Sequence, residues 1–286
     1  MTRVEMVERI LARLDGGKEQ VQAQWNAADR GTPTRFATID GLLPEAEARA
    51  IYEAFPHDGQ GFLTRNSFKE HKRTSSNLDQ YPLILADITY ALQDPRVVSK
   101  IDALTGLEGL EPDPHLYAGG LSMMFHRDFL NPHIDNSHEA TRSKYRRINL
   151  LYYVSPGWKQ EYGGNLELWD EEVTKPVTIT SAFNRLVLME TNKGSWHSVS
   201  PVVEETGARC CVSNYYFSEV SPTGAAYYHV TSFTGRPEQK ARRLVGHVDN
   251  AARTLARRLG MKRASDTGYS GELARLDDGQ GREPER

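Results

Sequence analysis

Between residues 112 and 218, short runs of β-branched and aromatic residues recur, separated by glycine, proline, asparagine and aspartate. The runs are HLYAGGLSMMF, INLLYYVS, NLELWD, VTIT, RLVLME, HSVSPVV and ARCCVSNYYF. Many short strands at close spacing are typical of a β-barrel or a β-sandwich. This segment constrains the fold more than any other part of the chain and predicts a central β-core at about 112–218.

Helical patterns precede and follow this β-core. Residues 4–25 carry apolar residues near helical spacing, and Gly16-Gly17 is expected to interrupt that helix. A short strand and a helix that begins near Pro44 come next, and two further helices are predicted near 81–93 and 95–105. The N-terminal part, 1–111, is therefore mainly helical.

After residue 235 the pattern becomes helical again, which predicts a C-terminal helix at about 236–259. The polar, glycine-rich end, 260–286, is expected to be disordered. We therefore expect a single domain over residues 1–259. The stretch 56–80 is polar and basic with few apolar anchors, and its length predicts a functional loop or lid.

The composition excludes several classes of protein. A hydrophobic share of 38%, a charged share of 26% and a net charge of −3 describe an ordinary globular chain without global attraction to nucleic acid. No apolar run approaches membrane-spanning length, and the N-terminus lacks the layout of a signal peptide. Cys210 and Cys211 are adjacent, so they cannot staple distant segments, and a reducing cytoplasm is the expected location.

His-x-Asp, a spacing that can supply two metal ligands, occurs three times in the chain, at 126–128, 133–135 and 247–249. The third lies in a helical stretch with no histidine after it, and the first lacks the companion residues of a protein kinase. The second, in FLNPHIDNSHE, lies in a segment rich in turn formers that reads as a loop. His133 and Asp135 are therefore either two metal ligands or polar residues on a surface turn.

Two ligands one residue apart fill only two corners of a coordination sphere, so a third must come from another strand. His197, in GSWHSVSPV, is the best candidate because it opens a predicted strand after a turn. Two imidazoles and one carboxylate on one face suit ferrous iron and leave positions for a chelating cosubstrate and oxygen. A hydrogen-bonded histidine at a strand edge is the competing interpretation.

The combined pattern HID, RINLLYYVSPGWKQEYGGNLELWD and NRLVLMETNKGSWHSVSPVVEETGARCCVSNYYF resembles the 2-oxoglutarate- and Fe(II)-dependent dioxygenases, and within them the prolyl 4-hydroxylase-like branch. The resemblance covers about residues 112–218. It implies an α+β fold, with a double-stranded β-helix (jelly-roll) core flanked by N-terminal and C-terminal helices. It also implies Fe(II), 2-oxoglutarate and O2 as cofactors, with ascorbate as a supporting reductant.

The resemblance assigns roles to individual residues. His133, Asp135 and His197 look like the iron ligands, and Arg209 looks like the residue that grips the distal carboxylate of 2-oxoglutarate through two parallel hydrogen bonds. Family counterparts of Ser213 and Tyr215 line the pocket, and Tyr153 matches a family tyrosine that donates to 2-oxoglutarate. Alternation puts Ser213 and Tyr215 on the strand face of Arg209, and Asn149 on that of Tyr153. The resemblance therefore implies Tyr153, Ser213 and Asn149 as cosubstrate positions and Tyr215 as a substrate position. Tyr153 reads equally well as a core aromatic. Met123 and Met124 stand where relatives often carry a tyrosine.

Substrate recognition is less constrained. Two polar segments could cap the pocket, 60–78 with Arg65, Lys69, Lys72 and Arg73, and 137–147 with Arg142, Lys144, Arg146 and Arg147. Their basic character would suit a small molecule bearing a carboxylate or a phosphate. The candidate substrate residues are Tyr215, Leu166, Arg146, Arg65 and His126, while His126 and Asp128 could instead stabilise the metal loop.

The leading functional hypothesis is hydroxylation of an unactivated C–H bond in a small metabolite or natural-product intermediate, with release of succinate and CO2. Desaturation, ring formation and epimerisation stay open. A prolyl hydroxylase acting on a peptide or protein is one alternative, and a non-catalytic binding module with the same fold is another. We expect a small-molecule partner, no nucleic acid and no membrane; the oligomeric state is left open, with a homodimer as one option.

Overall fold

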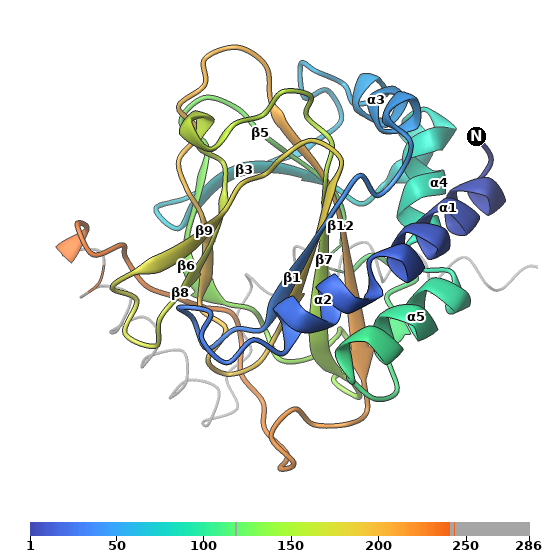
Figure 1. Ribbon diagram of the computed structural model, residues 1–286. Helices are drawn as coiled ribbons and strands as arrows, with labels where there is room; N and C mark the ends of the chain where they lie inside the picture. The colour runs from blue at the N-terminus through green and yellow to red at the C-terminus, as the bar shows by residue number, and fades with distance from the viewer. Residues whose placement is uncertain (118, 241–242, 244–286) are drawn as a thin grey trace, which may run out of the picture.

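The computed structural model describes residues 1–117, 119–240 and 243. The helices in these residues lie together on one side of a curled sheet (Figure 1). They are α1 (Arg3–Gly16), α2 (Lys18–Trp25), α3 (Glu45–Glu53), α4 (Leu83–Ala91) and α5 (Pro95–Thr105), with short 3-10 turns η1 (Leu78–Gln80) and η2 (Gln160–Tyr162). The first strands are β1 (Phe36–Asp40), β2 (Leu63–Asn66), β3 (Glu70–Ser75), β4 (Glu111–Pro112), β5 (Gly120–Met124), β6 (Phe129–Ile134) and β7 (Tyr145–Tyr153). The remaining strands are β8 (Leu166–Trp169), β9 (Pro176–Ile179), β10 (Arg185–Glu190), β11 (His197–Val199), β12 (Arg209–Ser218) and β13 (Ser232–Phe233).

The sheet follows the order β1-β10-β7-β12-β5-β3-β6-β11-β8-β9, with β2 beside β3, β4 beside β12 and β13 beside β6. Neighbouring strands along this path are antiparallel. The strands β1, β10, β7, β12 and β5 make one half, the strands β6, β11, β8 and β9 make the other, and β3 joins them. Figure 1 shows the two halves facing each other, which is the predicted jelly-roll architecture of an α+β protein.

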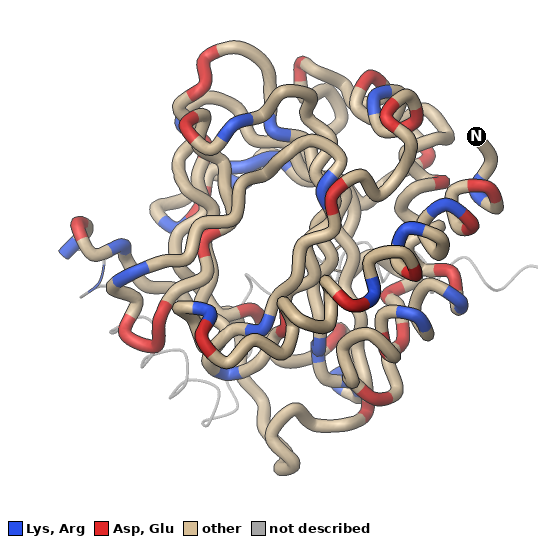
Figure 2. The backbone as a smooth tube through the Cα atoms, in the orientation of Figure 1, with Lys and Arg blue, Asp and Glu red and all other residues tan. Residues whose placement is uncertain are grey.

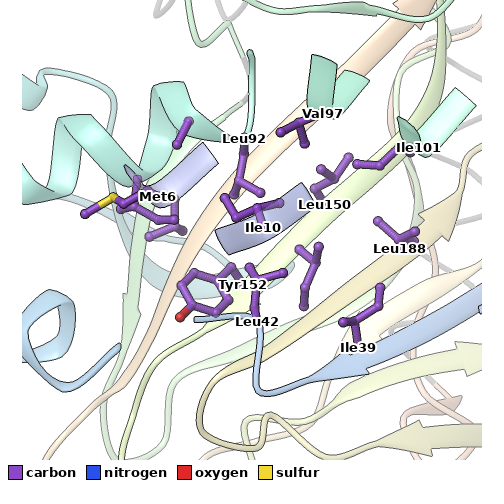
Figure 3. Close-up of a cluster of buried hydrophobic side chains, with 14 of the residues drawn as sticks. Met6, Ile10, Ile39, Leu42, Leu92, Val97, Ile101, Leu150, Tyr152 and Leu188 are labelled. Carbon is purple, nitrogen blue, oxygen red and sulfur yellow. The ribbon is translucent and has the colours of Figure 1, made fainter. Parts of the chain in front are cut away.

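Helices pack against the outer face of the first half through a buried apolar cluster. Met6 and Ile10 of α1 and Val97 and Ile101 of α5 meet Leu150 of β7 there (Figure 3). The α1 helix presents this face because its apolar residues recur at helical spacing, and a capping box between Thr2 and Glu5 fixes its start. Gly17 ends α1 and precedes α2, as the sequence predicted.

The alternation of β7 separates the two faces of the sheet. Leu150 and Tyr152 point outward into the helical cluster, whereas Leu151 and Tyr153 belong to a second cluster inside the barrel. Tyr153 is paired with Cys211 of β12, which lies in the same inner cluster. The inner face of β7 and β12 therefore carries the predicted cosubstrate positions.

The prediction of a loop over 56–80 was wrong. The segment forms a hairpin of β2 and β3, and β3 is an integral strand because it pairs with both β5 and β6. Its sequence, EHKRTS, does not show the alternation of a strand, because charged residues on both faces of β3 form ion pairs instead of apolar contacts. Lys72 pairs with Glu70, while His71 and Arg73 pair with the buried Asp128.

The prediction of a loop around His133 was wrong in the same way, because residues 129–134 form β6. The predicted C-terminal helix (236–259) falls almost wholly outside the described residues, and the predicted tail (260–286) falls entirely outside them. Within the described part of the chain, no helix is both long enough and apolar enough to cross a membrane. Figure 2 shows acidic and basic residues interspersed along the N-terminal helices.

Candidate metal and cosubstrate site

A bulge in β6 brings His133 to the inner face of the barrel. His197 of β11 lies opposite His133, but Val199 lies opposite Leu130, so three residues of β11 (197–199) span four of β6 (130–133). The extra residue restores Leu130 and His133 to the same face although they are three positions apart. Asn131, inside the bulge, donates its backbone N–H to the carbonyl of Lys69 on the neighbouring segment, which fixes the distortion.

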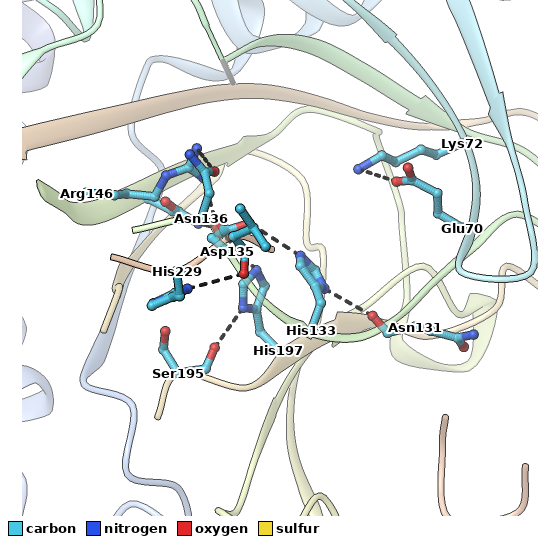
Figure 4. Close-up of polar contacts among 12 residues, drawn as sticks. Glu70, Lys72, Asn131, His133, Asp135, Asn136, Arg146, Ser195, His197 and His229 are labelled. Carbon is cyan, nitrogen blue, oxygen red and sulfur yellow. Dashed lines mark hydrogen bonds and ion pairs between the residues drawn. The ribbon is translucent and has the colours of Figure 1, made fainter. Parts of the chain in front are cut away.

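Three side chains from this region converge, as Figure 4 shows. His133, Asp135 and His197 each offer one ligand atom, and these atoms lie within 4.8 Å of one another. The Nε2 atom of His133 lies 3.5 Å from Oδ1 of Asp135, and Nε2 of His197 lies 3.6 Å from Oδ2. These distances leave the three atoms around a common centre that a metal ion could occupy.

Backbone carbonyls set the orientation of both imidazoles. The Nδ1 atom of His133 lies 3.0 Å from the carbonyl oxygen of Asn131, and Nδ1 of His197 lies 2.9 Å from that of Ser195. An Nδ1–H that donates to a carbonyl leaves a lone pair on Nε2, the atom that faces Asp135. Phe233 of β13 stacks on the His133 ring with 5.1 Å between centroids, which further restricts its rotation.

The electrostatics favour the protonation states that a metal needs. Burial lowers the pKa of His197 to about 4, so its imidazole is neutral at neutral pH. Although burial alone would raise it, the pKa of Asp135 lies well below its usual value because Arg146, His197 and His133 surround the carboxylate. Arg146 Nη1 lies 3.0 Å from Oδ2 of Asp135, and the Asn149 amide donates to the same oxygen at 2.9 Å. Neutral imidazole and ionised carboxylate are the ligand forms that bind divalent cations.

Arg209 lies inside the barrel at the start of β12 and is only 4% exposed. Its guanidinium contacts the Met124 sulfur, with 2.7 Å from Nη2 to Sδ, and lies over the Tyr153 ring at 5.4 Å from the centroid. Its Nε has no hydrogen-bond partner, and no carboxylate pairs with it among the described residues. A buried guanidinium with an unsatisfied donor fits an anionic ligand such as the distal carboxylate of 2-oxoglutarate.

Residues 119–217 match the model of the 2OG-Fe(II) oxygenase superfamily. The matched residues make up most of the β-core and about a third of the chain. The two histidines and the single carboxylate fit a ferrous iron, and the buried Arg209, which has no carboxylate partner among the described residues, fits 2-oxoglutarate.

The chain is similar to two proteins that are named as prolyl hydroxylases. It is 34% identical over 77 residues to the mouse prolyl 3-hydroxylase OGFOD1, a match that covers 25% of this chain and 14% of that protein. A solved structure of prolyl 4-hydroxylases from Phytophthora capsici is 19% identical, covers 77% of this chain and 68% of its own, and superposes with a TM-score of 0.52. At this identity the second similarity shows the fold.

The residues predicted to contact substrate make contacts within the protein, and these contacts differ from one residue to the next. Arg146 is occupied by Asp135, and its guanidinium lies 4.3 Å from the centroid of the Tyr215 ring. Leu166 belongs to the inner apolar cluster that includes Tyr153. Arg65 donates to the Thr74 hydroxyl on the β2–β3 hairpin. His126 faces the carbonyl of Val203, whereas its neighbour Asp128 is buried, as expected of a residue that stabilises the turn before β6.

The cosubstrate positions Ser213 and Asn149 lie on the inner face with Arg209. Ser213 pairs with Leu151, and Asn149 pairs with Tyr215 across β7 and β12. Burial raises the pKa of Tyr153, so its hydroxyl stays protonated and can act as a donor. Their roles toward 2-oxoglutarate stay predictions.

Sequence reasoning missed the segment 221–236, which lies against the metal site. We call it the strap. Its strand β13 pairs with β6, with Phe233 opposite His133. The strap is an irregular segment with only two strand residues, so its sequence shows neither helical nor strand periodicity.

Proposed function

We propose that this protein is a 2-oxoglutarate- and Fe(II)-dependent dioxygenase that hydroxylates an unactivated C–H bond. One atom of O2 enters the substrate as hydroxyl and the other enters succinate, with CO2 as the third product. The observation that carries the proposal is the combination of the His133, Asp135 and His197 cluster with a buried Arg209 that has no carboxylate partner among the described residues. A binding module that had lost catalysis would not need all four.

The chain's own residues would divide the work as follows. His133, Asp135 and His197 would hold Fe(II), which when bound supplies a centre for 2-oxoglutarate chelation and O2 reduction. Arg209 would anchor the distal carboxylate, and the protonated Tyr153 hydroxyl would donate beside it. Arg146 and Asn149 would hold one oxygen of Asp135 so that the other stays directed at the metal.

A compact substrate, such as a small metabolite, is favoured by the position of the strap. Strap residues hydrogen-bond along the backbone of residues 132–137, which borders the metal ligands. An extended peptide cannot pair with that edge while the strap occupies it.

Prolyl hydroxylation of a peptide or protein is the second candidate. The identity to the mouse prolyl 3-hydroxylase favours it, and the matched 77 residues are part of a much longer protein. A proline at the tip of a loop would reach the metal without pairing along β6. The cytoplasmic location also stays a prediction, supported by two buried free thiols, Cys210 and Cys211.

The test is succinate release from 2-oxoglutarate with Fe(II), ascorbate and candidate substrates. His133→Ala should abolish iron-dependent turnover, and Arg209→Met should raise the KM for 2-oxoglutarate by a hundredfold or so, because a charged bidentate contact is lost. Arg127→Met, on the exposed turn before β6, is the matched control. Equal succinate release by wild type and His133→Ala would refute the proposal.

A further inference from the structure

The strap covers one side of the candidate metal site through backbone pairing. Ser232 and Phe233 pair with Ile134 and His133, and the N–H of Thr234 donates to the carbonyl of Pro132. Further along, the N–H of Ser137 donates to the carbonyl of His229 at 3.1 Å. The strap thus runs antiparallel to the segment that bears two of the three metal-ligand candidates.

Beyond these contacts the strap lines a small, partly open cavity next to Asp135. The cavity is lined by polar side chains from four segments, which are Asp135, Asn136, Ser137, Arg146, Thr191, Asn192, Ser195, Tyr227 and His229. Asp135 and Arg146 neutralise each other, and the other lining residues carry no formal charge at neutral pH. Burial lowers the pKa of His229 and raises that of Tyr227 to about 12, which keeps both neutral.

One lining atom has no partner in the protein. Thr191 is 3% exposed, and its hydroxyl has no hydrogen-bond partner among the described residues. A buried hydroxyl without a partner carries a desolvation cost that a bound ligand could relieve. The His229 ring points its Nδ1 at the carbonyl of Val230, which leaves Nε2 as an acceptor, and the Tyr227 hydroxyl supplies a donor.

Five of the eight basic residues that the sequence suggested for an anionic substrate are occupied within the protein. Lys72 pairs with Glu70, Arg73 with Asp128 and Lys144 with Glu111. Arg146 pairs with Asp135, and Arg147 donates to the carbonyl of Val220. A carboxylate or phosphate that bound one of these five residues would have to break its contact, whereas a neutral polar group would not.

We propose that Thr191, Tyr227 and His229 form a substrate subsite for an uncharged hydrogen-bonding group, an amide or a hydroxyl, held next to the metal by the strap. This inference rests on the proposed function and adds the chemical class of the substrate. Thr191 and the two strap residues are then specificity determinants that contact substrate, while Asp135 and Arg146 serve the metal.

The experiment uses the full chain loaded with Mn(II) and 2-oxoglutarate and measures the paramagnetic relaxation of probe protons by NMR. The neutral probes are N-acetyl-L-proline methylamide, which presents amides, and myo-inositol, which presents hydroxyls. Their charged partners are N-acetyl-L-proline and an inositol monophosphate. At least one neutral probe should bind and show metal-dependent relaxation, each should bind more tightly than its charged partner, and the preferred neutral probe identifies whether amides or hydroxyls are recognised.

Thr191→Val separates ligand binding from folding. Valine has the same shape and removes a buried, unpartnered hydroxyl, so the melting temperature should stay constant or rise. Affinity for the preferred neutral probe should fall about fivefold to tenfold with the loss of one hydrogen bond. Tyr227→Phe should reduce it similarly. Tyr228→Phe, which removes a hydroxyl from the next, exposed strap residue, is the control and should leave probe affinity unchanged.

The outcomes distinguish the two proposals. Failure of the wild type to bind Mn(II) and 2-oxoglutarate overturns the proposed function, and this inference with it. Binding of both, combined with tighter binding of the anionic probes or with no neutral binding, overturns this inference alone. Unchanged probe affinity in Thr191→Val and Tyr227→Phe also overturns it.

Discussion

Replacing Arg146 by methionine should weaken metal binding without disturbing the barrel. The Arg146 guanidinium is the only cationic group that the structure pairs with Asp135 among the described residues, apart from the two metal-ligand histidines, and its side chain is 3% exposed. Methionine keeps an unbranched apolar stem next to the Tyr215 ring and removes the charge. The Asn149 amide then holds Oδ2 of Asp135 alone.

The magnitude follows from the direct contact of Arg146 with Asp135, the candidate metal ligand. Loss of a group that orients a metal ligand typically reduces metal affinity tenfold to a hundredfold, which corresponds to about 1.4–2.8 kcal/mol. Because the methionine variant also loses a cation that stabilises the Asp135 carboxylate, the pKa of that carboxyl should rise. Metal binding in the variant should therefore weaken more steeply at low pH.

Calorimetric titration with Mn(II) at neutral pH measures the difference directly. Arg142→Met is the matched control, since it removes the same group from an exposed position above the Tyr228 ring, 4.7 Å from its centroid. The control should bind Mn(II) as the wild type does. A folded Arg146→Met protein with wild-type Mn(II) affinity would show that the pair with Asp135 does not position the ligand.

Three further predictions concern stability and reactivity. In the metal-free protein the pKa of His197 is about 4, whereas in the unfolded chain this histidine takes up its proton near pH 6.5. The contribution of His197 to the free energy of unfolding is therefore fully present above pH 6.5 and is lost as the pH falls toward 4. The loss should reach about 3 kcal/mol in urea unfolding, and His197→Gln should flatten that pH dependence. Burial raises the pKa of Cys210 to about 12 and also raises that of Cys211, so a thiol reagent should label both only after denaturant is added. Gly163→Ala should cost several kcal/mol in thermal unfolding, because a Cβ at its φ of +72° would collide with the Pro201 carbonyl. Gly157→Ala, at φ +67° in open space, is the control and should cost about 1 kcal/mol. Equal losses in the two variants would show that the collision is relieved.

The sequence predicted most of the β-core because alternation is strong where one face meets the helices and the other meets the barrel interior. The run at 148–155 was predicted as a strand, and the structure has β7 at Tyr145–Tyr153. Alternation grouped Tyr153 with Leu151, and both lie in the inner cluster. The helices were predicted because their apolar periodicity and their glycine and proline boundaries agree, as at Gly17 and Pro95.

Two strands escaped prediction for physical reasons that the structure makes explicit. In β3 the charged residues pair with one another or with the buried Asp128, a contact between residues more than fifty positions apart. In β6 the bulge breaks the two-residue period, and Pro132 argues against a strand. Both features require knowledge of the neighbouring strands, which local pattern cannot supply.

The metal-ligand candidates could be selected from sequence because the chemistry needs particular residue types, whereas the strap could not. Its contacts with residues 132–137 are mostly backbone hydrogen bonds, which leave little trace in residue type. Yet the strap supplies Tyr227 and His229 to the cavity and Phe233 to the His133 ring. The barrel thus carries the residues suited to the chemistry, and a segment outside it carries those suited to recognition. Proteins that share the barrel but differ in the segment after β12 should therefore share iron and 2-oxoglutarate while differing in substrate.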